Sequence, residues 1–198
     1  LITINVITRH PEDVRITKTM SANPLLLNYT FAPFSQIAVE HMVPAITRIL
    51  EQNRAEMEQL KQLKDVHWDN FVTPLEQCDN RLSMAWSIIA HLKSVDNSEA
   101  LREAYNECLP LITEYATDVS QSLPLYQQFE KLRQQTDTLN AVQRKIVDDA
   151  IRDFQLAGVH LDEVAQQQYR NIQQQLAKLS TTFEEHLLDA TKAWHLTL

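Results

Sequence analysis

The 198-residue chain contains a single glycine, Gly158, where average usage of about 7% would give roughly fourteen. Few other residues accept a positive φ, which tight turns between strands and phosphate-binding loops require. The scarcity of glycine therefore favours an all-helical fold and argues against a P-loop or a dinucleotide site. It also excludes a Gly-x-Ser-x-Gly nucleophile elbow, because one glycine cannot supply that motif.

Cysteine is scarce as well, and long hydrophobic runs are missing. Cys78 and Cys108 are far apart in the sequence and form no CxxC motif. No secretory segment is visible, so we predict two reduced thiols in a cytoplasmic protein, with a structural disulfide as the alternative. No apolar run approaches the roughly 18 residues that span a bilayer, which predicts a soluble protein without a membrane partner.

Acidic residues outnumber basic ones: the chain has 26 Asp and Glu but 18 Lys and Arg, which gives a formal net charge of −8. Lys and Arg occur singly, usually close to acidic residues or Gln, as on the solvated face of a helix. A negative field without a segregated basic patch repels a phosphate backbone. We therefore expect no nucleic-acid partner.

Seven histidines raise the question of a metal site. A helical zinc peptidase needs His-Glu-x-x-His, which the chain lacks. The inverted pattern His-x-x-Glu-His is nearest at residues 182–186, but Thr182 stands where its first ligand should be. Glu-x-x-His, which a di-iron bundle needs twice, is missing too. We predict no catalytic, cofactor-binding or metal-binding residue in this chain, and no cofactor.

Apolar periodicity predicts an all-α bundle of about six mostly antiparallel helices joined by short loops. Residues 1–19 are rich in Thr, Ile and Val and are predicted to be an N-terminal extension, either a strand or a flexible arm, before a helical domain at 20–198. The expected helices are Glu40 to about Leu63, Asp69 as N-cap to about Val95, Glu99 to about Ser120, Pro124 to Gln135, Ala141 to Ala157 with Gly158 as C-cap, and a long helix after Asp162.

The aromatic residues are interpreted as core, because they recur at helical spacing and lack the interleaved basic residues of a base-stacking surface. This prediction covers Trp68, Trp86, Trp194, Phe129, Phe154 and Phe183.

The last helix carries an apolar seam that continues almost to the end of the sequence. Its residues step forward by three or four and so share one face: Ile172, Leu176, Leu179, Phe183, Leu187, Ala190 and Trp194. No Gly, Pro or capping residue follows Trp194, although helices usually end on such a signal. We expect a helix interrupted in mid-course, with Phe183, Leu187 and Trp194 lacking part of their packing surface and the turns from about Asp189 onward prone to fray.

Several segments resemble, in collinear order over about residues 20–196, the N-terminal part of the thimet oligopeptidase and oligopeptidase A family of zinc metallopeptidases. Oligopeptidase A is the nearest in pattern. The segments are NPLL (23–26), PFSQI (33–37), EHMVPA (40–45), WDNF (68–71), PLE (74–76), HLKSVDNSEALREAY (91–105), AIRDFQLAG (150–158) and LDAT (188–191). Residues 1–19 depart from the family pattern.

The resemblance implies a non-catalytic helical region that forms one wall of the peptide-access channel and restricts substrates to short peptides. The family's zinc ligands and general base lie in a later part of a much longer chain, so we carry over no catalytic or metal residue. The resemblance further implies that zinc belongs to that catalytic part, that the catalytic part is the partner of this region, and that the 198 residues alone are inactive.

The alternative is a stand-alone helical interaction module derived from such a peptidase, with the seam from Ile172 to Trp194 as its docking face. A four-helix cytokine-like bundle is disfavoured, because neither a signal segment nor a disulfide framework is visible.

Overall fold

The computed structural model describes residues 23–27, 31–135 and 137–194. These ranges contain six α-helices and no strand, which confirms the predicted all-α bundle. The predicted extension at 1–19 lies outside the described residues. Three short 3₁₀ helices, η1 (Pro24–Leu26), η2 (Phe34–Gln36) and η3 (Val39–His41), precede α1 (Met42–Lys61), α2 (Trp68–Val95), α3 (Glu99–Ser120), α4 (Leu123–Arg133), α5 (Ala141–Leu156) and α6 (Glu163–Ala193).

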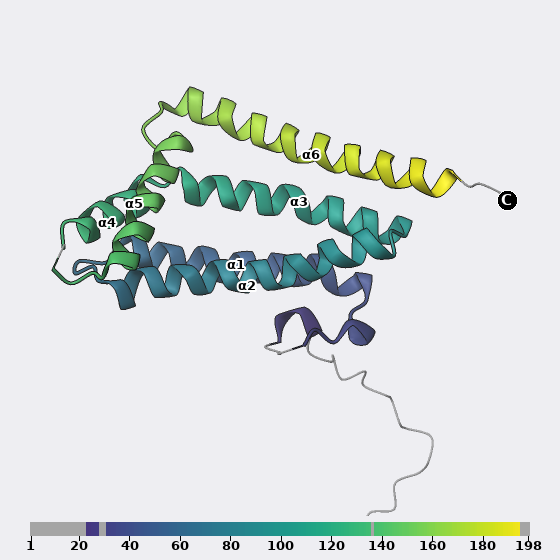
Figure 1. Cartoon of the computed structure of the whole chain (residues 1–198), viewed down its shortest axis with the longest axis horizontal. Coiled ribbons are helices and arrows are strands. Elements are labelled where there is room, and N and C mark those ends of the chain that lie inside the picture. Colours follow the sequence, from purple (N-terminus) through teal and green to yellow (C-terminus); the bar gives the residue numbers. More distant parts are fainter. Residues whose placement is uncertain (1–22, 28–30, 136, 195–198) are drawn as a thin grey trace, which may run out of the picture.

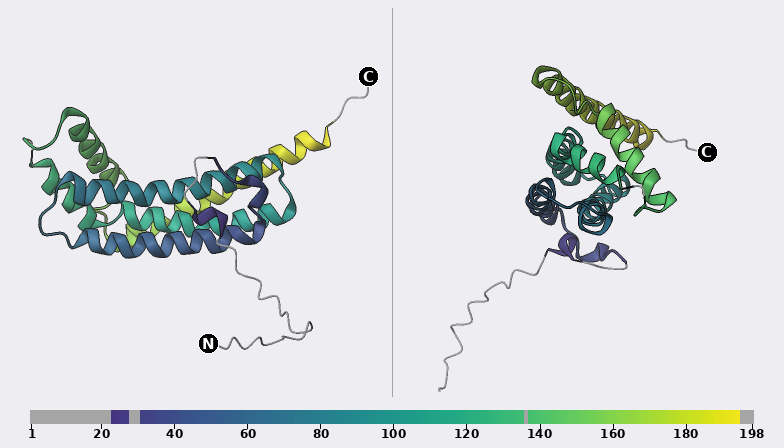
Figure 2. Two further views of the ribbon diagram at one scale, coloured as in Figure 1. Left: turned by 90° about the horizontal axis from the view of Figure 1, so that it is seen from below. Right: turned by 90° about the vertical axis from the view of Figure 1, so that its left-hand side faces the viewer.

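The long helices lie side by side, and α4 and α5 pack on each other at one end of them (Figure 1). Helix α1 contacts both α2 and α3, whereas α6 lies along α3. In the end view of Figure 2, α6 forms an outer layer on α3, on the side away from α1. Following the colours along the chain, α1 and α2 run antiparallel, as do α2 and α3, and α3 and α6.

The core lies between α1, α2 and α3 and is closed at one end by α4 and α5. Phe71 of α2 meets Phe129 of α4 edge to face, with ring centroids 4.8 Å apart. Edge-to-face contact adds to the burial of two large apolar rings. Phe154 of α5 packs against Phe129 in turn. The core prediction is therefore confirmed for Phe129 and Phe154, while Trp68 and Trp86 are partly buried against this core.

Side chains of the N-cap residue cap two of the six described α-helices, α5 and α6. The prediction that Asp69 is the N-cap of α2 is wrong: His67 occupies that position, and its backbone N–H donates to Asn70 Oδ1 at 2.9 Å. Asp69 instead lies in the first turn, where its carboxylate interacts favourably with the positive end of the helix dipole. Gly158 ends α5 as predicted, with φ +83, a conformation in which a Cβ would also lie 2.4 Å from Leu161 Cδ1.

Candidate functional site

Helix α6 presents an apolar face to solvent. The large apolar side chains along α6, and that of Trp194 directly after its end, are between 56% and 74% exposed. We call this set the α6 apolar seam: Val164, Ile172, Leu176, Leu179, Phe183, Leu187 and Trp194. The prediction that Phe183 and Trp194 belong to the core is wrong, because they are 69% and 74% exposed. Of the 31 residues of α6, all of them described, Thr181 alone is buried.

The opposite face of α6 is polar and packs on α3. Arg170 Nη1 donates to Asp118 Oδ1 at 2.6 Å, and Arg170 Nε donates to Gln121 Oε1 at 3.1 Å. Further along, Gln174 Nε2 donates to the carbonyl of Pro110 at 3.0 Å. An amphipathic helix on a bundle normally turns its apolar stripe inward. Helix α6 does the reverse.

The second half of α6 is held in the same way. Arg102 of α3 forms a two-pronged ion pair with Asp189, and hydrogen bonding from this guanidinium lowers the pKa of the Asp189 carboxyl. Lys93 of α2 is buried, lies 4.6 Å over the ring of Tyr105, and donates to Glu184 Oε2 at 3.4 Å. Because burying an unpaired ammonium is costly, Glu184 fixes the position of α6 opposite Lys93.

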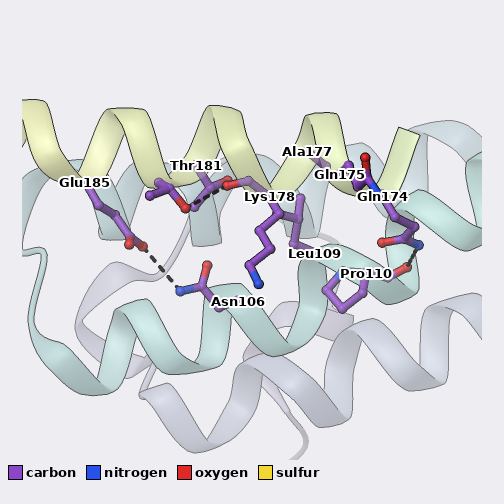
Figure 3. A pocket seen from close by; sticks show the side chains of 10 residues that line it. Asn106, Leu109, Pro110, Gln174, Gln175, Ala177, Lys178, Thr181 and Glu185 are labelled. Atoms are coloured by element: carbon purple, nitrogen blue, oxygen red, sulfur yellow. Dashed lines mark hydrogen bonds between the residues drawn. The ribbon is translucent and has the colours of Figure 1, made fainter. Parts of the chain in front are cut away.

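A cavity of about 460 Å³ remains between α3 and α6 (Figure 3). Gln174 and Glu185 of α6 lie near its two ends, and the Lys178 side chain extends from α6 toward α3. Asn106 Nδ2 donates to Glu185 Oε1 at 3.3 Å across this space. The two helices are therefore joined by separate polar contacts and not by a continuous apolar layer.

The start of α6 is fixed by its cap. Asp162 Oδ1 accepts a hydrogen bond from the N–H of Ala165 at 2.8 Å, which satisfies one of the free donors of the first turn. The helix therefore begins where the sequence predicted it, after Asp162. At about 1.5 Å per residue, its 31 residues span roughly 46 Å.

The described part of the chain offers no group of three or more His, Cys, Asp or Glu residues that could hold a metal ion. Thr182, at the first-ligand position of the inverted zinc pattern, donates its hydroxyl to the carbonyl of Lys178 at 2.9 Å. Cys78 and Cys108 are buried free thiols, and burial raises the pKa of each to about 12. No helix among the described residues is both long and apolar enough to cross a membrane.

Residues 46–167 match the family model of the neurolysin/thimet oligopeptidase N-terminal domain. The chain belongs to this family. The resemblance found in the sequence is thereby confirmed, with the match ending in the second turn of α6. Most of the α6 apolar seam thus lies after the part that the family model covers.

Several relatives of the chain are oligopeptidases A. The chain is 40% identical over 175 residues to oligopeptidase A of Haemophilus influenzae and 42% identical over 175 residues to that of Escherichia coli, covering 87% of this chain and 26% of each relative. It is 37% identical over 176 residues to a probable cytosolic oligopeptidase A of Arabidopsis thaliana, covering 88% of this chain and 25% of the relative. The chain therefore spans about a quarter of the length of the relatives it matches.

Proposed function

We propose that the chain acts as the non-catalytic N-terminal region of an oligopeptidase A-like zinc metallopeptidase, in which it forms one wall of the peptide-access channel. The family match and the identity to oligopeptidases A support this proposal. Zinc and the catalytic residues then belong to the remaining part of such an enzyme. No residue of this chain is assigned as a ligand, because the described residues do not fit a metal site.

The α6 apolar seam is the observation that carries the proposal. Five of its large apolar side chains, each more than half exposed, follow one face of a helix roughly 46 Å long: Ile172, Leu176, Leu179, Phe183 and Leu187. Contiguous exposed apolar surface of this kind marks an interaction site. Complete burial of one such side chain is worth roughly 1.5–3 kcal/mol, so covering the seam releases substantial free energy. The catalytic part of the enzyme is the partner that we propose for it.

The wall would act by shape. Its three central helices pack into a continuous apolar core, and a rigid surface of this kind can limit what enters a channel beside it. Short peptides would be admitted and folded proteins excluded. The substrates of the proposed enzyme are therefore short peptides, and its location is the cytoplasm, in line with the word cytosolic in the name of one Arabidopsis relative.

The proposal is tested with the purified 198-residue chain and a separately produced catalytic part of the Escherichia coli relative. We expect the chain alone to bind no stoichiometric zinc and to leave a quenched fluorogenic peptide intact, and to bind the catalytic part. Leu179→Gln with Leu187→Gln should abolish that binding. Val142→Gln, a matched change at a 68% exposed site on α5, should leave it unchanged. Zinc-dependent turnover by the chain alone would overturn the proposal.

The alternative is a stand-alone interaction module that docks a partner through the same seam. The exposed seam favours this function as well, since an amphipathic helix can bind another helix through its apolar face. Light scattering separates the two. A self-contained module should be a monodisperse monomer or dimer, whereas a wall without its partner should associate irregularly or aggregate.

A further inference from the structure

A second apolar surface is a half-open groove lined mainly by α2, α3 and α5, which we call the α2–α5 groove. Its volume is about 520 Å³, in the range of sites that bind peptides and small molecules. Buried Val72, Tyr115 and Phe154 contribute to its floor, while Trp86, Ile112 and Ile146 line it with partly exposed side chains. Figure 1 shows α5 at the end of the bundle where α2 begins and α3 ends, and residues of these three helices line the groove.

The charged residues that line this groove are all acidic. Glu76 and Asp79 come from α2 and Asp153 from α5, and none of the described lining residues is Lys or Arg. Among the ion pairs of the described residues, none includes Glu76 or Asp79, and Asp153 is paired with Arg152 of its own helix. Two carboxylates to which the described part of the chain offers no ion-pair partner thus line the groove beside its apolar floor.

Trp86 adds a second feature that suits a cation. Its ring stacks on Tyr105 with centroids 4.5 Å apart, and the side chain also lines the groove. An aromatic ring in the same groove as carboxylates adds the attraction of its quadrupole for Lys and Arg side chains to that of the charges. The apolar floor, in contrast, gains free energy only from apolar side chains.

We propose that the α2–α5 groove binds a peptide segment in which one or two bulky apolar side chains are flanked by Lys or Arg. The apolar side chains would occupy the floor beside Phe154, and the basic side chains would pair with Glu76 and Asp79. Charge complementarity selects this occupant over an acidic or neutral one. Every lining residue comes from this chain, so the inference does not depend on the role of α6 and is tested without a catalytic part.

The test measures fluorescence anisotropy of a labelled Lys-Phe-Leu-Arg peptide, blocked at both ends, with the full 198-residue chain. Saturable binding is expected, and the same peptide with Glu in place of Lys and Arg should bind at least tenfold more weakly. Glu76→Gln with Asp79→Asn should weaken binding of the basic peptide about tenfold and remove the preference. Glu103→Gln is the matched control, since Glu103 is an exposed acidic residue of α3 outside the groove lining.

Ile146→Ser tests the apolar part of the site. Ile146 is 39% exposed, so the variant should fold, which a urea midpoint close to that of the wild-type chain would verify. Binding of the basic peptide should fall severalfold. Three results would overturn the proposal: equal binding of the basic and acidic peptides, a loss of affinity in Glu103→Gln as large as in the variant with Glu76→Gln and Asp79→Asn, or no binding by the wild-type chain. Self-association that competes with the peptide and is lost in Ile146→Ser would identify a second copy as the occupant and overturn it as well.

Discussion

Replacing one phenylalanine on each side of the bundle distinguishes a core residue from a residue of the α6 apolar seam. Phe129 is 2% exposed and contacts two other phenylalanine rings, so Phe129→Ala leaves a cavity in the core. Such a change lowers the free energy of unfolding by about 3–5 kcal/mol. Phe183→Ala removes the same atoms from a side chain that is 69% exposed.

The expected cost of Phe183→Ala is far smaller. Complete burial of a phenylalanine is worth roughly 1.5–3 kcal/mol, and only about a third of Phe183 is covered, which gives a loss of about 0.5–1 kcal/mol. Alanine is the better helix former by about 0.5 kcal/mol, which offsets much of that loss. The net change should lie within about 0.5 kcal/mol of zero.

Urea unfolding followed by far-UV circular dichroism measures both variants, at two protein concentrations at least tenfold apart. The m-value should stay constant, so that the midpoint reports the free energy of unfolding. If Phe183→Ala lowered the free energy of unfolding as much as Phe129→Ala, at both protein concentrations, the seam would be packed within one chain. This result would refute the placement of α6. A comparable loss that appears only at high concentration would mean that the seam is covered by a second copy.

Three further predictions concern single sites. Cys78 and Cys108, with pKa values of about 12, should not react with a thiol reagent at pH 8 until urea unfolds the chain, and rapid reaction of the folded chain would contradict their burial. Asp162→Ala should lower the free energy of unfolding by about 1 kcal/mol through loss of the α6 cap, and an unchanged urea midpoint would show that the cap contributes nothing. Arg102 lowers the pKa of Asp189. Their contact therefore stabilises α6 fully at a pH above the ordinary Asp pKa of about 3.9, and this stabilisation is lost as the pH falls through the lower pKa of the folded state. NMR titration should give Asp189 a higher pKa in Arg102→Gln, and equal pKa values in the variant and the wild-type chain would argue against the pair.

The helices could be predicted from the sequence because their signals are local. Apolar periodicity, the cap at Asp162 and the terminating Gly158 each act within a few residues, and all six helices appear close to the expected ranges. The start of α2 was misplaced because an aspartate is a common N-cap. Asn70 instead accepts the hydrogen bond from the N–H of His67, which a pattern of residue types does not distinguish.

The environment of each face could not be predicted, since periodicity identifies an apolar face but not what lies opposite it. Phe154 and Phe183 have the same helical spacing, yet one is 7% exposed and the other 69%. The α2–α5 groove was missed for a related reason. Its floor and rim come from helices that are far apart in the sequence, so no single window contains the site.

The orientation of α6 bears directly on what the seam is for. Its contacts with α3 include the ion pair of Arg170 with Asp118, whose side chains are 36% and 29% exposed, and the pair of Arg102 with Asp189, at 23% and 53%. Pairs of this exposure are typically worth about 0–1 kcal/mol each, because water already solvates the charges. The polar face therefore determines where α6 lies without contributing most of the free energy that the helix could release.

The larger contribution to the free energy is available on the apolar face of α6. If the seam existed only to hold α6 on the bundle, it would face α3, and Arg170 and Asp189 of α6 would lie in water. With the polar face inward, apolar residues such as Leu179 and Leu187 are of use only when another surface covers them. A second surface on the seam would then hold α6 between two layers, one polar and one apolar, which is the arrangement that the function proposed above requires of this helix.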